Sequence, residues 1–248
     1  MSKPDPLPAK RLRRTSAPAP AASAAPATAT TPSGKPQRHF AIIGAGMAGI
    51  VCARTLVQAG HRVTVFEKSH QAGGRTATID SPFGNFDAGA QYFTVRDPRF
   101  ARAIDTVPGI CKRWSANSVQ VLDAAGRVAA VGLPHREAHW VATPGMQSLV
   151  TTWAEPLAQA GQLVTHTRVT RIEPDAVNAP GWQLRTEGAG GEQHVYAGFD
   201  AVLLAQPSVP AQALISGSRL DSPLADAMSK VAIAPCWTLM LAYPQAVR

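Results

Sequence analysis

The sequence has few of the features on which several common classes of protein depend. Its three cysteines are isolated and odd in number (Cys52, Cys111 and Cys236), so no disulfide framework is indicated and a reducing, cytoplasmic compartment is favoured. No stretch approaches the run of about 20 apolar residues that crosses a membrane. There is no G-x-S-x-G, no Walker sequence and no Cys/His metal spacing, which argues against the corresponding hydrolases, nucleotide hydrolases and zinc sites.

Acidic and aromatic residues are nearly missing from the first part of the chain. Residues 1–38 contain eight prolines, nine alanines, seven basic residues, one acid and no aromatic residue. Such a segment cannot bury enough apolar surface to offset its ordering entropy, so we predict a disordered tail over 1–38. Arg13-Arg14 is not followed by the apolar stretch of a secretion signal, and the prolines oppose the amphipathic helix of a transit peptide. Because a bare basic run is more often solvated than bound, no nucleic-acid partner is expected.

The most informative pattern is a glycine motif between two apolar segments. Residues 40–43 form a short apolar run typical of a buried parallel strand, and Gly44, Gly46 and Gly49 follow it as G-x-G-x-x-G. These glycines permit a tight turn, the approach of a pyrophosphate to the backbone, and close helix–strand packing. Residues 48–58 carry the apolar stripe of a helix, whose amino terminus favours an anion.

A second predicted strand, 62–66, ends on an acid. Glu67 follows Gly44 by 23 positions, where an acid that binds the adenosine ribose belongs. An acid at this place favours a free ribose hydroxyl, as in FAD or NAD, over a 2′-phosphate. A glycine-rich turn that binds nothing is the alternative, and the succession of strand, turn, helix, strand and acid argues against it. The pattern predicts a Rossmann-type dinucleotide-binding unit.

Two further stretches favour FAD over NAD. Residues 67–75 read E-K-x-x-x-x-G-G-R, and residues 87–93 read D-x-G-A-Q-Y-F. Together they resemble the flavin amine oxidase superfamily, and A-Q-Y-F-T-x-R-D-x-R-F at 90–100 is most similar to its renalase-like branch. The resemblance covers about 40–243. It implies an α/β fold with a Rossmann-type FAD-binding domain (glutathione-reductase-like, amine oxidase type) and an inserted α+β substrate domain.

The resemblance also implies functional residues. The implied FAD-binding residues are Gly44, Gly46, Met47, Ala48, Gly49, Glu67, Lys68, Gly74, Arg75, Gln91, Tyr92, Phe93 and Val169. Arg75 would contact the pyrophosphate, 91–93 would lie near the isoalloxazine ring, and Val169 would offer a backbone amide to the adenine. No catalytic side chain is predicted, because the flavin carries the chemistry.

The candidates for the substrate pocket are Gln91, Tyr92, Trp140 and Met146. For 140–146, an aromatic residue and a methionine that merely staple two elements together are an equal alternative. For 73–75, the alternative is a loop with a solvated arginine. His135 and His139 have a spacing that could hold a metal on a helix, but no third ligand accompanies them, and no metal is expected.

The predicted domain organisation follows the resemblance. An FAD-binding Rossmann segment over 39–100 is followed by a substrate-domain segment over 101–160, a return to the FAD-binding domain over 161–210 and a substrate-domain part over 211–248. The patterns within them predict a hairpin over 118–133 and a helix over 146–160 closed by Gly161. They also predict short strands at 163–165, 169–172, 182–186 and 194–196. The resemblance implies two further strands, over 199–207 and 235–244.

The predicted function is that of a non-covalent FAD-dependent oxidoreductase of the renalase-like kind. It would take a hydride from a small reduced substrate, a dihydronicotinamide isomer, and pass the electrons to molecular oxygen. An amine substrate and a desaturase-like activity are the alternatives. A third alternative is an inactive nucleotide-binding or interaction protein, because no glycine/aspartate motif of the kind that closes such proteins follows Tyr243. We therefore expect a C-terminally truncated chain that holds FAD weakly.

Overall fold

The computed structural model describes residues 36–114, 123–128, 138–220 and 223–243. The predicted tail up to residue 35, His135 and most of the predicted hairpin over 118–133 lie outside the described residues. The turn of that hairpin is described: the Asp123 carbonyl accepts from Gly126 N at 2.9 Å, and the Asp123 side chain accepts from Arg127 N at 2.9 Å.

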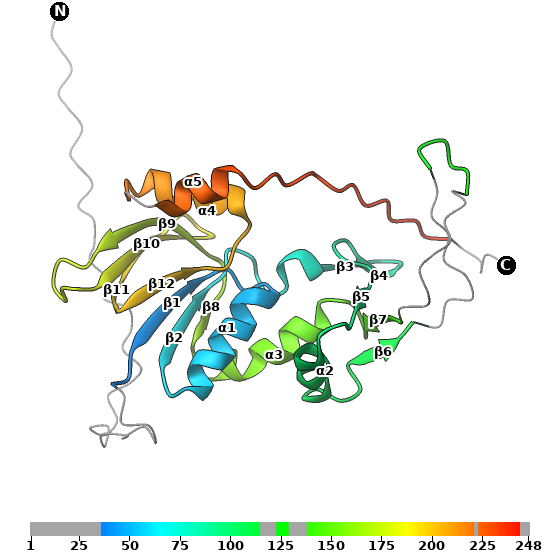
Figure 1. The fold of residues 1–248 in the computed structure, drawn as a ribbon, viewed down its shortest axis with the longest axis horizontal. Helices are drawn as coiled ribbons and strands as arrows, with labels where there is room; N and C mark the ends of the chain where they lie inside the picture. Colours follow the sequence, from blue (N-terminus) through cyan, green and yellow to red (C-terminus); the bar gives the residue numbers. More distant parts are fainter. Residues whose placement is uncertain (1–35, 115–122, 129–137, 221–222, 244–248) are drawn as a thin grey trace, which may run out of the picture.

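A four-stranded parallel sheet forms the centre of the structure, with strand order β12-β1-β2-β8 (Figure 1). Its strands are β1 (His39–Ile43), β2 (Arg62–Phe66), β8 (Leu163–Val164) and β12 (Ala201–Leu204). In the register of the sheet, Ile42 lies opposite Val65 and Leu203. The predicted strand–helix–strand unit is confirmed, since α1 (Met47–Gln58) connects β1 to β2.

The two faces of this sheet are covered by different elements. Ile42 and Val65 belong to a buried cluster with Ile50 of α1 and with Trp153 of α3 (Ser148–Gln159). Their neighbours Ala41, Ile43 and Phe66 face the other way, because side chains alternate along a strand, and they pack against a second sheet. Helix α3 thus packs in the core of the central sheet, although its residues fall in the predicted substrate-domain segment. The domain boundaries stay a prediction.

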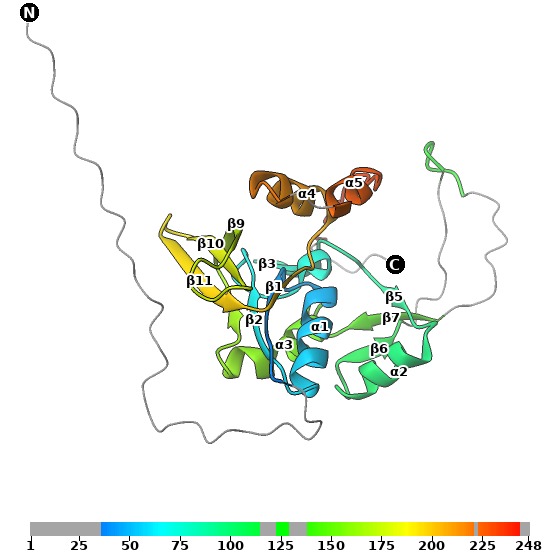
Figure 2. The ribbon, with the colours of Figure 1, turned by 60° about the vertical axis from the view of Figure 1, so that its left-hand side comes forward.

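The second sheet is antiparallel, with strand order β11-β10-β9 (Figure 2). Its strands are β9 (Thr167–Pro174), β10 (Trp182–Gly188) and β11 (Gln193–Phe199). Helices α4 (Ser208–Gly217) and α5 (Pro223–Ser229) follow β12, and α4 lies beside β9. The strand predicted over 199–207 is confirmed as β12, which pairs with β1 and returns the chain to the central sheet.

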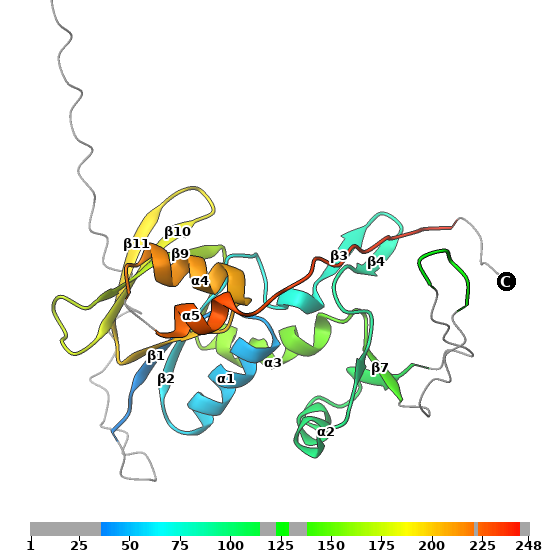
Figure 3. The ribbon, with the colours of Figure 1, turned by 45° about the horizontal axis from the view of Figure 1, so that its top comes forward.

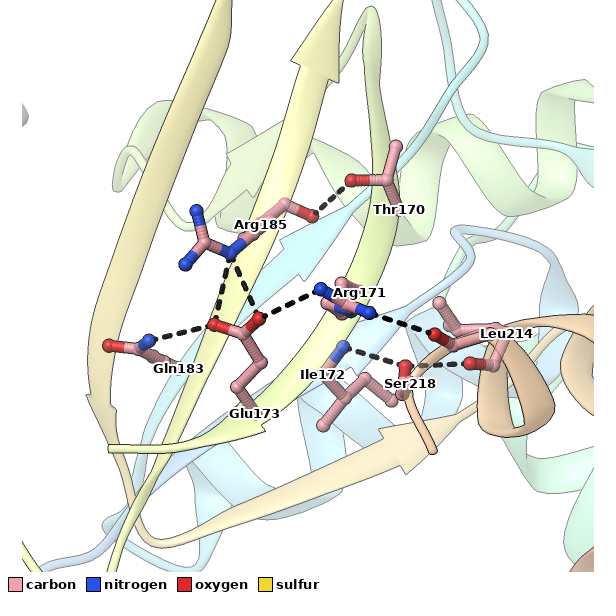
Figure 4. A network of polar contacts seen from close by, with 9 residues as sticks. Thr170, Arg171, Ile172, Glu173, Gln183, Arg185, Leu214 and Ser218 are labelled. Atoms are coloured by element: carbon pink, nitrogen blue, oxygen red, sulfur yellow. Dashed lines mark hydrogen bonds and ion pairs between the residues drawn. The ribbon is translucent and has the colours of Figure 1, made fainter. Parts of the chain in front are cut away.

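A polar network joins β9 to its neighbours (Figure 4). Glu173 accepts from Arg185 Nε at 3.0 Å and from Gln183 Nε2 at 3.0 Å, and the Arg185 side chain lowers the pKa of the Glu173 carboxyl group. The Ser218 hydroxyl, just beyond α4, accepts from Ile172 N at 2.9 Å. These contacts anchor the edge strand β9 on both of its sides.

A third part of the structure consists of short strands and one helix. The hairpin of β3 (Thr78–Ser81) and β4 (Gly84–Asp87) precedes a three-stranded antiparallel sheet of order β5-β7-β6. That sheet contains β5 (Phe93–Thr94), β6 (Cys111–Arg113) and β7 (His139–Ala142). Helix α2 (Pro98–Asp105) begins after Asp97, whose side chain caps it by accepting from Arg99 N. These elements lie to one side of the central sheet (Figure 1).

The prediction of a strand over 235–244 is wrong for the residues that the structure describes, 235–243. Figure 3 shows this segment running extended from α5 toward the β3–β4 hairpin, with no helix or strand assigned to it. Trp237 is 94% exposed, and Thr238 Oγ1 donates to the Ala88 carbonyl at 2.9 Å. A strand requires a neighbour that pairs with its backbone groups, and no strand of the described part pairs with this segment.

Among the described helices, none has both the length and the apolar character needed to span a membrane.

Candidate dinucleotide-binding site

Two of the three motif glycines are required by packing. Gly44 has φ +108°, and a Cβ added to it would lie 2.9 Å from the carbonyl oxygen of Ala205. A Cβ on Gly49 would lie only 1.9 Å from the carbonyl oxygen of Gly44. Gly46 differs, because the nearest atom to a Cβ added there is Gly74 Cα at 3.9 Å. Gly44 and Gly49 therefore close the turn onto α1, whereas Gly46 has room for a Cβ in ordinary contact with the Gly74 backbone.

The amino terminus of α1 is not capped by a side chain. Gly46 is the N-cap, no side chain caps the helix, and no acid occurs in its first turn. The first amides of a helix have no acceptor within the helix and carry a partial positive charge. Met47 and Ala48, predicted to bind the cofactor, are the first residues of this helix. This end of α1 is therefore suited to a diphosphate.

Glu67 lies at the end of β2 and faces the glycine turn. Its side chain is 7% exposed; Oε2 accepts from Ala45 N at 2.8 Å and Oε1 from Ser69 N at 2.9 Å. Each carboxylate oxygen accepts more than one hydrogen bond, so both keep capacity for a ribose hydroxyl. Besides its predicted ligand role, Glu67 holds the glycine turn in place, which sequence spacing did not indicate.

The predicted G-G-R loop lies beside this turn. Gly73 N donates to the Ala45 carbonyl at 3.0 Å, and Gly73 forms a parallel bridge with Gly46. The short helix η1 (Gly74–Thr76) follows, and it exposes the Arg75 side chain. No described residue forms an ion pair or a hydrogen bond with the Arg75 guanidinium, which leaves its donors available to a phosphate.

Gln147, which the sequence patterns did not single out, fixes the position of that loop. Its side chain is 6% exposed; Nε2 donates to the Ala72 carbonyl at 2.5 Å and Oε1 accepts from Thr78 N at 2.9 Å. Thr78 Oγ1 donates in turn to Asp87 Oδ1 at 2.7 Å. Gln147 precedes α3 directly, at the beginning of the helix predicted over 146–160. No spacing rule marks such a residue, because its partners are backbone groups about 70 positions away.

The chain returns to the Arg75 loop before the predicted flavin-facing segment. A Cβ on Gly89 would lie 2.1 Å from the Arg75 carbonyl oxygen, so only glycine fits there. Ala90 N donates to the same carbonyl at 3.0 Å, and Gln91 Nε2 donates to the Gly89 carbonyl at 2.9 Å. These contacts place residues 91–93 immediately beyond Arg75.

The predicted pocket residues do not form one group in this structure. Gln91 and Tyr92 are exposed, but Met146 is 2% exposed and lies in the core. Trp140 contacts Arg113, whose guanidinium carbon is 5.6 Å from the indole centroid, whereas Tyr92 stacks on His139. Because His139 and Trp140 are successive residues of β7, they point to opposite faces of their sheet.

Phe93, predicted to bind the cofactor, packs inward. Its ring lies 5.6 Å from that of Phe100, and it packs against the buried cluster shared by α1 and α3. The half-buried Phe93 side chain is therefore directed mainly to the core.

The adenosine end of the predicted site has its own cavity. Thr167 N donates to the Glu67 carbonyl at 2.8 Å, which brings β9 to the end of β2. Val169 lies two residues further along this strand. A cavity of about 500 Å³ opens here, and its lining includes Lys68, His166 and Arg168.

The described residues contain no group of three or more His, Cys, Asp or Glu side chains that could hold a metal ion.

Comparisons with known proteins find similarity over the same part of the chain. The family model of the NAD(P)-binding Rossmann-like domain matches residues 42–107. A putative L-amino-acid oxidase, YobN, of Bacillus subtilis (strain 168) is 51% identical over 55 residues, which are 21% of this chain and 12% of that protein. The flavin-containing monooxygenase FMO GS-OX-like 6 of Arabidopsis thaliana is 28% identical over 180 residues, 70% of this chain and 35% of that protein.

Among solved structures, wild-type putrescine oxidase bound to putrescine has a similar fold. The TM-score is 0.53 at 15% sequence identity, with 72% of this chain and 60% of that chain covered. The chain thus spans only part of the length of each of these proteins. It has an α/β fold with a Rossmann-like dinucleotide-binding domain, and its structural neighbours include a putrescine oxidase.

Proposed function

We propose that this chain is the dinucleotide-binding part of an FAD-dependent oxidoreductase of the amine oxidase type. The observation that supports the proposal most directly is the convergence of three groups on one turn. The uncapped amino terminus of α1, the carboxylate of Glu67 and the loop that carries the exposed Arg75 all adjoin the Gly44–Gly49 motif. Together they match an adenosine diphosphate: amides and a guanidinium for two phosphates, and a carboxylate for ribose hydroxyls.

The residues around the glycine turn fit the adenosine diphosphate half of FAD. Gly46 carries no side chain, which lets a pyrophosphate approach the backbone at this position. Glu67 would hold the ribose, Arg75 and the α1 amides would hold the phosphates, and β9 at Val169 would border the adenine. When bound, FAD supplies a hydride acceptor, and the protein binds and orients the reactants.

For the substrate, we propose a small reduced molecule of the dihydronicotinamide isomer type, with molecular oxygen as the final acceptor. The support is the sequence at 90–100, which resembles the renalase-like branch and directly follows the Arg75 loop in the structure. An amine, including the amino group of an amino acid, is the second candidate. It is favoured by the identity to a putative L-amino-acid oxidase.

Titration with FAD tests the cofactor proposal. We expect the 248-residue chain to bind FAD and ADP weakly, and Arg75→Gln to lower both affinities about ten- to hundredfold, the loss of a charge-assisted hydrogen bond. Arg102→Gln, on the exposed surface of α2, is the matched control. Unchanged affinity in Arg75→Gln would contradict the assignment of Arg75.

Oxygen consumption tests the substrate proposal. A chain that retains stoichiometric FAD should produce hydrogen peroxide with dihydronicotinamide isomers. Turnover of amines or amino acids, with no reaction of the isomers, would replace the first candidate with the second.

A further inference from the structure

Three aromatic rings form a shelf on the β5-β7-β6 sheet. Tyr92 stacks on His139 with a centroid separation of 4.1 Å and an interplanar angle of 28°. Trp114 lies 6.0 Å from each of these rings, at 30° to His139 and 32° to Tyr92. We call these three residues the aromatic shelf. Tyr92 and His139 cover each other's facing sides, so the outer faces of this nearly parallel stack are the ones left for a further ring.

The strand register explains why these rings meet. His139 pairs with Thr94 across β5 and β7, and Trp114 N donates to the His139 carbonyl at 2.8 Å. The opposite face of the same sheet carries Phe93 and Trp140, which are partners in the register. Phe93 packs into the core with α2, so that face of the sheet is covered by the rest of the protein.

The shelf is not arranged like a structural aromatic cluster. Tyr92 is 42% exposed and Trp114 is 45% exposed, whereas Trp153 in the core is 1% exposed. Among the described residues, none hydrogen-bonds the Tyr92 hydroxyl or the Trp114 indole N–H. Both rings therefore keep surface that is accessible to a ligand.

The shelf is continuous with the dinucleotide-binding site. Tyr92 follows Gln91, whose side chain bonds the Gly89 carbonyl, and Gly89 packs directly on the Arg75 carbonyl. The Arg75 loop and the first ring of the shelf are therefore held by one short, mutually bonded stretch of chain. A ligand on the shelf would lie on the side of the site away from the adenosine end, which is at Lys68 and β9.

We propose that the aromatic shelf binds the planar aromatic ring of the small-molecule substrate, an assignment that rests on the proposed oxidoreductase function. Parallel ring faces attract another ring by offset stacking, worth about two- to tenfold in affinity per ring pair. A saturated ring of similar size has no such interaction. The shelf therefore selects aromatic substrates over aliphatic ones, whether the reacting group is a dihydropyridine or an amine.

A pair of matched ligands tests the inference. Benzylamine and cyclohexanemethylamine carry the same charge and the same number of non-hydrogen atoms, and they differ in whether the ring is aromatic or saturated. Dissociation constants are measured by ligand-observed NMR on the 248-residue chain without FAD. We expect benzylamine to bind about five- to tenfold more tightly, and this preference to disappear in Trp114→Leu and in Tyr92→Leu.

Two controls make the result specific. Trp237→Leu removes a fully exposed tryptophan outside the shelf and should keep the preference, while Trp114→Phe should keep part of it. Equal binding of the two amines, or an unchanged preference in both shelf variants that fold normally, would overturn the inference. Since no turnover and no FAD are required, a failure here is separate from a failure of the FAD titration.

Discussion

The side chain of Gln147 joins two backbone segments that flank the G-G-R loop. Its Nε2 lies 2.5 Å from the Ala72 carbonyl oxygen and its Oε1 lies 2.9 Å from Thr78 N. Both partners belong to the stretch that carries Arg75, and Gln147 itself directly precedes α3. The position of α3, which packs on α1, therefore also determines the position of the loop that carries Arg75, the proposed phosphate-binding residue.

Replacing Gln147 should destabilise the protein and weaken ligand binding together. Gln147→Leu removes the partner of the buried Ala72 carbonyl and of the part-buried Thr78 amide. This costs about 2–4 kcal/mol and frees the Arg75 loop. We expect a lower urea midpoint and weaker ADP binding. Gln159→Leu, on the exposed surface of the same helix, should change neither; a similar loss there would show that the effect of Gln147 is not local.

Gly49 should tolerate no side chain. Gly49→Ala would place a Cβ 1.9 Å from the Gly44 carbonyl oxygen, so the turn and the helix must separate, at a cost of about 1–3 kcal/mol. Gly217→Ala is the control, because nothing lies within 4 Å of a Cβ added there, and we expect it to be neutral or slightly stabilising. Urea unfolding of both variants measures the difference, and equal stabilities would show that the turn adapts freely.

Replacing Glu67 should both destabilise the glycine turn and weaken the binding of FAD. In Glu67→Gln, the amide group faces either Ala45 N or Ser69 N, both of which are donors, so one hydrogen bond is lost. We expect a lower melting temperature and about a tenfold or larger loss of FAD affinity. Glu155→Gln, exposed on α3, is the comparison for the loss of one charge. Wild-type FAD affinity in Glu67→Gln would mean that the carboxylate serves the turn alone.

The lowered pKa of Asp175 leads to a prediction of how the stability of the fold depends on pH. The Asn178 side chain and the backbone amides of Val177, Asn178 and Gly198 lower the pKa of Asp175 to about 2. Because this folded-state pKa is below the ordinary value, the ionised carboxylate stabilises the fold above about pH 4, and this contribution is lost as pH falls toward 2. Asp175→Asn should therefore lower the melting temperature at pH 7, and the difference from wild type should shrink between pH 4 and 2.

The control for this effect is Asp80→Asn, an exposed acid of β3. We expect its melting temperature to follow that of the wild type across the same range of pH. A pH-independent difference between Asp175→Asn and wild type would contradict the electrostatic origin.

Local sequence patterns determined the nucleotide-binding unit. Gly44, Gly46, Gly49 and Glu67 act within about 25 residues of one another, and each has a conformational or chemical requirement that few other residues meet. Their strands and helix could be predicted because the apolar alternation, the glycine turn and the terminal acid all specify the same arrangement. The short strands of the second sheet were also predicted, with boundaries that differ by a few residues.

The tertiary structure alone decided the contacts between distant segments. Gln147 reaches Ala72, Thr238 reaches Ala88, and Tyr92 meets Trp114 and His139. The fold also separates Tyr92 from Trp140 and buries Met146, although the family resemblance implied one substrate pocket for these residues. Such contacts depend on strand register and on the packing of whole elements. No periodicity within a single segment encodes them, so their physical origin lies in the fold and not in the local sequence.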